Sequence, residues 1–278
     1  MSLETQHRAK TKVALATEAI VEEEGRYVYC VADAREDMSL GKIGIEGHKV
    51  HTIPHKDICA VVHSCPAQPY QSDDQEVVKA WVRMHQKVVD AAWERWGTVL
   101  PLSFDTIIRG EVEKSAEQNV KDWLKQEYKE FKRRIEKVRG KAEYGVQVFW
   151  EPKVIAQSLT STSPEIKRLD EEIKTKPKGL AYMYRQRLEN LMKHEMETKA
   201  DEYFKDFYGR IRKYTDDVRV EKTKKAEPGL SMIINLSCLV YRDRYAELGE
   251  ELGKINRMRG FAVRFTGPWP PYSFVGGA

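Results

Sequence analysis

The chain has 278 residues, of which 41% are hydrophobic and 32% charged, and this composition predicts a folded protein with one large core or two ordinary ones. Its 47 basic and 43 acidic side chains leave a formal net charge of +4, too small a surplus to favour nucleic acid or an anionic membrane as the main partner. No apolar run has the length of a signal peptide core or a membrane span, so the cysteines are expected as reduced thiols in the cytoplasm. They are Cys30, Cys59, Cys65 and Cys238.

The first part of the chain is predicted to be an N-terminal extension, residues 1–26, followed by an α+β domain over residues 27–140. Residues Ala14–Glu24 have the composition of a short helix, and no strand pattern begins before Tyr27. Aromatic and β-branched runs bounded by Asp, Gly and Pro then predict a mixed sheet with helices. The strand candidates are Tyr27–Ala32, Val50–Ile53, Ile58–His63 and the extended segment Thr98–Phe104.

Two helices are predicted in this N-terminal domain. Ser72 is expected to cap the first, with Gln75 as its capping-box partner, and apolar residues at helical spacing continue to Trp96. Gly97 ends this helix, whose apolar stripe is expected to face the sheet. The same periodicity predicts a second long helix from about Glu111 to Arg139.

The pattern then changes, and residues 141–278 are predicted to form a ferredoxin-like βαββαβ domain with an extended Pro/aromatic tail. Its strands and helices, in chain order, are predicted at Tyr144–Trp150, Tyr184–Ile211, Asp217–Glu221, Met232–Val240, Tyr245–Ile255 and Phe261–Phe265. Met232–Val240 is almost continuously apolar, which predicts a central, covered strand. The charged stretches Lys153–Lys178 and Lys222–Gly229 are predicted to be mobile loops.

Histidines and cysteines gather in one part of the N-terminal domain, at His48, His51, His55, Cys59, His63 and Cys65. These residue types bind zinc, but their spacing matches no paired-ligand zinc motif, and Cys59 and His63 share a strand face with Val61 that reads equally well as core. A nucleophilic pair of Cys59 or Cys65 with His85 has no motif behind it. A metal-dependent or cysteine enzyme is therefore a rival hypothesis, and no catalytic, cofactor or metal site is assigned.

A second rival is a nucleic-acid-binding module, because ferredoxin-like sheets bind RNA through exposed aromatic residues on central strands. The central strand Ile233–Cys238 contains no aromatic residue, and Phe261 and Phe265 alternate as core residues do. This reading therefore depends on fold analogy alone.

The chain ends in a proline-stiffened aromatic tail, Phe265–Val275. We expect it either to clamp the two domains together by docking near Thr98–Phe104, which we favour, or to bind a partner. A buried Trp269 is part of the clamp hypothesis. The candidate site residues are Pro268, Trp269, Pro270, Pro271, Tyr272 and Phe274.

Several stretches, in order along the chain, match segments of one protein family. They are Tyr27–Tyr29, Asp57–Val62, Thr98–Phe104, Tyr144–Val148, Gly179–Met183 and Asn235–Arg244. With the tail, they resemble the gas vesicle protein F/L (GvpF/GvpL) family over about Tyr27 to Val275. Two positions depart from the family pattern: Cys30 stands in place of a common Gly, and Asp105 in place of the Gly in the usual F-G-T.

The resemblance implies a minor structural component or assembly factor of gas vesicles. Such a protein is expected to associate with the main hydrophobic shell protein and with other gas vesicle accessory proteins, and to bind neither nucleic acid nor membrane. The family supplies no catalytic residues to carry over, so the resemblance implies a cytoplasmic, vesicle-associated protein without enzymatic activity or cofactor.

Overall fold

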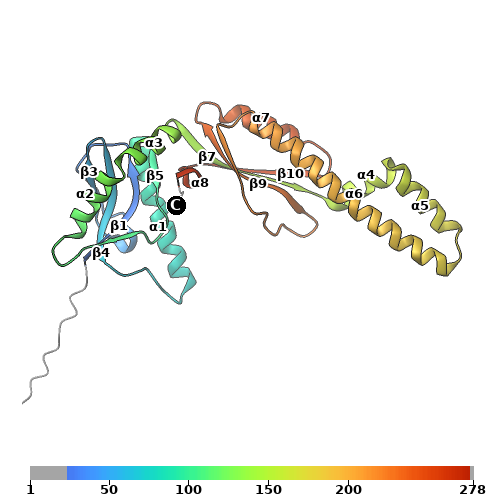
Figure 1. Ribbon diagram of the computed structural model, residues 1–278, viewed down its shortest axis with the longest axis horizontal. Helices are drawn as coiled ribbons and strands as arrows, with labels where there is room; N and C mark the ends of the chain where they lie inside the picture. The colour runs from blue at the N-terminus through green and yellow to red at the C-terminus, as the bar shows by residue number, and fades with distance from the viewer. Residues whose placement is uncertain (1–23, 276–278) are drawn as a thin grey trace, which may run out of the picture.

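The computed structural model describes residues 24–275, which form two antiparallel sheets with helices around them (Figure 1). The strands of the N-terminal sheet are β1 (Glu24–Ala32), β2 (Ser39–Gly41), β3 (Val50–His55), β4 (Ile58–Pro66), β5 (Val99–Pro101) and β6 (Ile107–Arg109). Their order is β2-β3-β4-β1-β5, and β6 pairs with the other end of β1. A single turn of 3-10 helix, η1 (Ile45–Gly47), lies between β2 and β3.

Every neighbouring pair in the N-terminal sheet is antiparallel, so the predicted mixed sheet is wrong. The helix α1 (Gln75–Trp96) joins β4 to β5, and these two strands run parallel, but β1 lies between them. The sequence pattern also does not predict the short strands β2 and β6. The predicted helix Ala14–Glu24 lies outside the described residues except for Glu24, which begins β1.

The N-terminal sheet is covered on both faces, because side chains alternate along each strand. On β4, Ile58 and Val62 belong to a core with α2 (Ala116–Gln126) and α3 (Tyr128–Val138). Cys59 and Val61 belong to the core under α1 on the other face. Figure 1 shows α1 separated from α2 and α3 by the strands. The sheet is therefore the middle layer of three.

Both predicted helices differ in detail from the structure. The cap of α1 is Asp74, whose carboxylate accepts a hydrogen bond from the Glu76 N–H at 2.8 Å, so Ser72 is not its cap. The segment predicted as one helix over Glu111–Arg139 is divided into α2 and α3 at Glu127. Because of this break, apolar residues of both helices pack in the same core. One straight helix of that length would extend beyond the sheet, and part of its apolar face would not reach this core.

The C-terminal sheet contains β7 (Lys141–Trp150), β8 (Asp217–Val220), β9 (Ser231–Tyr241) and β10 (Phe261–Trp269), in the order β10-β7-β9-β8. β9 is an inner strand, as its apolar sequence predicts. The helices α6 (Lys178–Arg212) and α7 (Tyr245–Asn256) pack on one face. The opposite face, called the open face below, carries the alternate residues of β7, among them Glu143 and Gln147.

The predicted mobile loop Lys153–Lys178 is wrong, because these residues are helical. They form α4 (Pro152–Thr162), α5 (Pro164–Thr175) and the start of α6, which project beyond the C-terminal sheet as an arm (Figure 1). A proline lies in the first turn of α4 and of α5, and the Ser163 hydroxyl accepts a hydrogen bond from the Ile166 N–H at 3.5 Å. Leu159 and Leu169 are buried within the arm.

The other stretch, Lys222–Gly229, is a loop as predicted, since no helix or strand is formed between β8 and β9. Its mobility stays a prediction. The longest helix, α6, has 35 residues and carries charged side chains along its length. Between residues 24 and 275, no helix combines the length and the apolar character needed to cross a membrane.

Candidate interaction site at the C-terminal tail

The tail does not stay extended to its end. β10 continues through Trp269, and after Pro270 and Pro271 the chain forms the short helix α8 (Tyr272–Val275). Gly267 permits the approach of β10 to β7, because a Cβ there would lie 2.8 Å from the Glu143 carbonyl oxygen and its φ is +117°. The tail thus leaves the C-terminal sheet and turns at two adjacent prolines.

The helix α8 lies against β5, an edge strand of the N-terminal sheet. At this edge α8 contacts the cores on both faces of the sheet. Tyr272 packs against the core under α1, and Phe274 and Val275 are buried in the core under α3. Leu239 of β9 belongs to this second core, so both sheets contribute to it. The tail therefore contacts the N-terminal sheet at β5, which lies within the segment Thr98–Phe104.

The burial of the aromatic residues differs from expectation in one respect. Trp269 is 47% exposed, whereas Phe274 is 4% exposed, so the expectation of a buried Trp269 is wrong. The prolines Pro270 and Pro271 are buried, and Pro268 is exposed. Alternation from Phe261 and Phe265 would place Trp269 on the core side, but the register of β10 shifts between Thr266 and Trp269 and Trp269 belongs to neither core. The helix α8 then brings Tyr272 and Phe274 into contact with the cores.

Hydrogen bonds attach α8 to the open face of the C-terminal sheet and to α3. The Glu143 carboxylate accepts from the Ser273 N–H at 2.7 Å and from the Ser273 hydroxyl at 2.5 Å. The same hydroxyl lies 3.1 Å from the Ser237 hydroxyl on β9. From α3, the Arg134 guanidinium donates to the Val275 carbonyl at 2.8 Å. These polar partners cannot be recognised in the sequence, because a lone Glu or Ser carries no motif.

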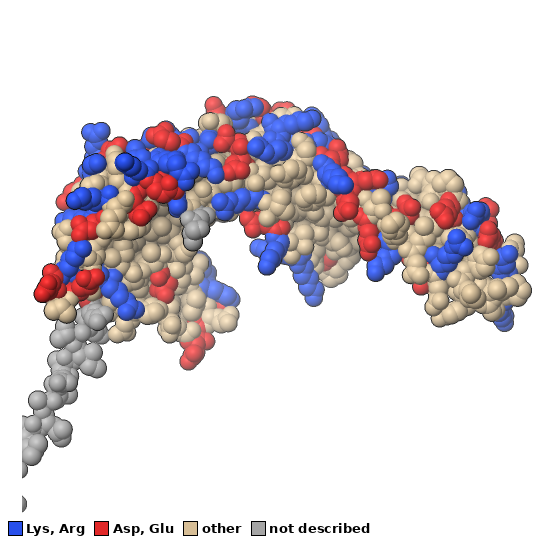
Figure 2. Space-filling view, viewed as in Figure 1, with Lys and Arg blue, Asp and Glu red and all other residues tan. Residues whose placement is uncertain are grey.

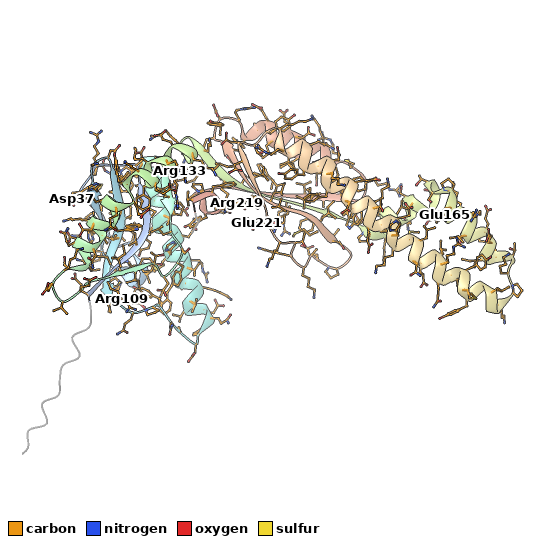
Figure 3. The ribbon with its side chains drawn as sticks, viewed as in Figure 1. Asp37, Arg109, Arg133, Glu165, Arg219 and Glu221 are labelled. Atoms are coloured by element: carbon orange, nitrogen blue, oxygen red, sulfur yellow. The ribbon has the colours of Figure 1, made fainter. Side chains whose placement is uncertain are left out.

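Charged side chains join the two sheets around the tail. Lys137 of α3 pairs with Asp217 of β8 at 2.7 Å. Arg242, after β9, donates to the Gly97 carbonyl at 2.8 Å and lies 4.0 Å from the centre of the Trp93 ring on α1. Figure 3 labels Arg133 on α3 and Arg219 on β8, which lie on opposite sides of this junction.

Two histidines are buried in a network with tyrosines: His63 of the histidine and cysteine cluster, and His85, the possible partner of a nucleophilic cysteine. His63 contacts the Tyr29 hydroxyl through Nδ1 at 2.8 Å and the Tyr70 hydroxyl through Nε2 at 3.0 Å. His85 contacts the Tyr27 hydroxyl through Nδ1 at 2.8 Å. Burial lowers the pKa of His63 to about 3 and that of His85 to about 4, so both imidazoles are neutral at pH 7.

The rival hypothesis of cysteine chemistry receives no support from the geometry. Burial raises the pKa of the Cys59 thiol to about 12 and that of Cys65 to about 11, which disfavours the nucleophilic thiolate. His48 stacks on His63 with ring centres 4.8 Å apart. Over residues 24–275, no three His, Cys, Asp or Glu side chains meet in a group suited to a metal ion. Cys59, His63 and Cys65 are buried in the N-terminal core, whereas His48, His51 and His55 are half-buried.

Fold and site together define a class: an α+β protein of two antiparallel sheets whose C-terminal segment packs at the junction between them. The family model described as "Gas vesicle synthesis protein GvpL/GvpF" matches residues 25–276. The chain belongs to this family, as the sequence resemblance predicts, and this membership gives it a gas-vesicle-related role.

The individual relatives agree with the family match. The chain is 29% identical over 263 residues to gas vesicle protein L1 of Halobacterium salinarum, with 90% of each chain covered. It is 26% identical over 243 residues to gas vesicle protein L of Haloferax mediterranei, covering 84% of this chain and 72% of that protein. The crystal structure of the gas vesicle protein GvpF from Anabaena sp. PCC7120 has a TM-score of 0.73 at 17% identity and covers 92% of this chain and 99% of that chain. This last likeness shows the shared fold.

Proposed function

We propose that the protein is a minor structural component or assembly factor of gas vesicles, which associates with the main hydrophobic shell protein during vesicle nucleation and growth. The observation that carries this proposal is the match to the GvpL/GvpF family over residues 25–276. We place the protein in the cytoplasm and on the gas vesicle, with other gas vesicle accessory proteins as further partners. It acts without catalysis or cofactor.

In this proposal the chain is organised as an N-terminal α+β domain over residues 27–140 and a ferredoxin-like domain over residues 141–278. Strand order supports the second assignment: numbered within the C-terminal sheet, the strands follow 4-1-3-2 with all neighbours antiparallel. The two crossover connections, through α6 and α7, cover the same face.

The tail acts in this proposal as a clamp between the two domains. Its support is the pair of contacts made by adjacent residues of α8: Ser273 is bonded to Glu143 of the C-terminal sheet, and Phe274 is buried against the N-terminal sheet. A detachable tail would expose Phe274 and leave Glu143 without these two donors.

A clean deletion strain without a paralogue tests the vesicle role. We expect fewer vesicles or none by electron microscopy, and purified full-length protein should retain the shell protein in a pull-down. Vesicles of normal number and shape would count against the proposal. The rival metalloenzyme makes a separate prediction, a stoichiometric zinc ion whose removal by a chelator lowers the melting temperature.

A further inference from the structure

The open face of the C-terminal sheet is occupied at one end and hollow at the other. At the end near the N-terminal sheet, Glu143 and Ser237 hold the chain's own α8. At the far end, Gln147 and Phe149 of β7 line a cavity of about 350 Å³. The open face thus binds α8 at Glu143 of β7. Further along β7, at Gln147 and Phe149, it has a recess large enough for a few side chains.

The recess has an apolar floor and a wall formed by a loop. Met232 of β9 and Ala262 of β10 supply most of the floor, together with the small exposed part of Phe149 on β7. The wall is the loop between β8 and β9, which starts beside Glu221, labelled in Figure 3. The Asn235 amide donates to the backbone carbonyl of this loop at Lys222, at 2.7 Å, and so attaches the wall to the sheet.

The rim of the recess carries an excess of positive charge. Lys224, Lys225 and Arg264 line it together with one carboxylate, that of Glu227. Arg264 and Glu227 are 3.5 Å apart with exposed side chains, a pair that contributes little to stability. Over residues 24–275, neither lysine forms an ion pair. Figure 2 shows blue side chains projecting from the lower edge of the C-terminal sheet, on the concave side of the molecule.

We propose that this recess binds an acidic peptide segment of a partner protein, with a carboxylate at Lys224, Lys225 and Arg264 and a neighbouring apolar side chain on the floor. A partner carboxylate would replace Glu227 beside Arg264 and would also pair with Lys224 and Lys225, which form no ion pair within residues 24–275. The inference is independent of the proposed vesicle role, since it depends only on the charge and shape of the recess.

Nucleic acid fits the recess less well than a peptide. Sequence-tolerant binding of single strands requires exposed aromatic rings on which bases stack. The aromatic ring in the recess belongs to Phe149, which is 7% exposed and lies 5.5 Å from the Arg264 guanidinium. This ring therefore has no free face on which a base could stack.

Selection from a phage-displayed library of random ten-residue peptides on the full chain tests the proposal. We expect enrichment of Asp or Glu beside apolar residues. Fluorescence anisotropy with an enriched peptide should show binding weakened at least about tenfold by Lys224→Gln/Lys225→Gln. The matched control Lys205→Gln/Lys213→Gln removes the same charge from two exposed positions, one on α6 and one directly after it, and should leave binding unchanged. Glu227→Gln should strengthen binding.

All these substitutions are at exposed residues, so circular dichroism and melting temperatures should match those of the parent chain. Enriched peptides without carboxylates, or equal binding by the parent and the Lys224→Gln/Lys225→Gln variant, would overturn the proposal. The same holds if a labelled thymidine oligonucleotide or phosphatidylglycerol vesicles bind through these lysines while acidic peptides do not. Vesicle formation is not measured, so failure here leaves the proposed function untouched.

Discussion

The backbone N–H and the hydroxyl of Ser273 both donate hydrogen bonds to the Glu143 carboxylate, although 130 residues separate the two in sequence. Glu143 is only 9% exposed, and a buried carboxylate without donors is strongly destabilising. The contact fixes the start of α8 on the C-terminal sheet while Phe274 reaches the N-terminal core. Loss of either polar partner should therefore loosen the tail.

Replacing Ser273 by Ala should lower the free energy of unfolding by about 1 to 3 kcal/mol, because a hydrogen bond to a buried carboxylate is lost. Urea denaturation of the full chain measures this change. Ser64→Ala on β4 is a matched control at an exposed strand position. Equal stabilities of the two variants would show that the Ser273 hydroxyl does not stabilise the fold.

Replacing Phe274 or Trp269 of the tail by Ala should lower the free energy of unfolding by very different amounts. Phe274→Ala should lower the free energy of unfolding by about 3 to 5 kcal/mol, as expected for a buried Phe. Trp269→Ala should lower it by about 1 kcal/mol or less, because nearly half of its surface is exposed. Thermal and urea unfolding of both variants check this order, and a larger effect at Trp269 would contradict the packing described for α8.

The sequence predicts that the tail meets the segment Thr98–Phe104, but not which aromatic residue is buried. Its composition reveals stiff prolines and large apolar side chains, and both favour docking. Burial depends on where α8 begins, and this is set by Glu143 and Ser273, which are distant in sequence. Periodicity within the tail carries no information about such a contact.

The secondary structure is predicted well where one face of an element is apolar and poorly where charge dominates. Alternation along Tyr144–Trp150 and the apolar run Met232–Val240 identify β7 and β9, because their side chains fill the core. Lys153–Lys178 is mostly polar and has few apolar residues, of which Ile155, Leu159, Ile166 and Leu169 are buried. These few contacts with α6 make the stretch helical.

The histidine and cysteine residues show why residue type alone does not identify a site. Cys59, Val61 and His63 alternate on one face of β4, and the core interpretation follows from that spacing. His63 is hydrogen-bonded to the hydroxyls of Tyr29 and Tyr70, which lie on other segments, so no local sequence motif predicts these contacts. The geometry therefore favours a role for Cys59 and His63 in packing of the N-terminal core over a role in metal binding or catalysis.

The arm should lose its order before the rest of the molecule does. Leu169→Ala removes a fully buried side chain that holds α5 within the arm, whereas the cores of both sheets lie elsewhere. Hydrogen exchange by mass spectrometry should show faster exchange across α4 and α5, with protection of β7 and β9 retained. Leu188→Ala, at a partly buried position on α6, is the comparison variant and should have a smaller effect. Faster exchange in all segments together would instead mean that the arm and the sheets unfold as one unit.

The neutral core histidines should make the protein sensitive to acid. The pKa of His63 is lowered to about 3 and that of His85 to about 4 in the folded chain, while both residues take the ordinary value near 6.5 when unfolded. Between these values the unfolded chain binds more protons, so the free energy of unfolding falls as the pH falls. Above about pH 6.5 this contribution to stability is complete.

Urea denaturation between pH 7.5 and pH 4.5 should therefore show a nearly constant free energy of unfolding above about pH 7 and a decline of roughly 2 kcal/mol per pH unit near pH 5. His63→Gln should reduce that slope by about half, whatever its effect on stability at pH 7, because one of the two titrating imidazoles is removed. The range above pH 7 serves as the internal control, since both imidazoles are then neutral in both states. An unchanged slope in His63→Gln would show that this imidazole does not titrate on unfolding and that its burial beside Tyr29 and Tyr70 is not maintained in solution.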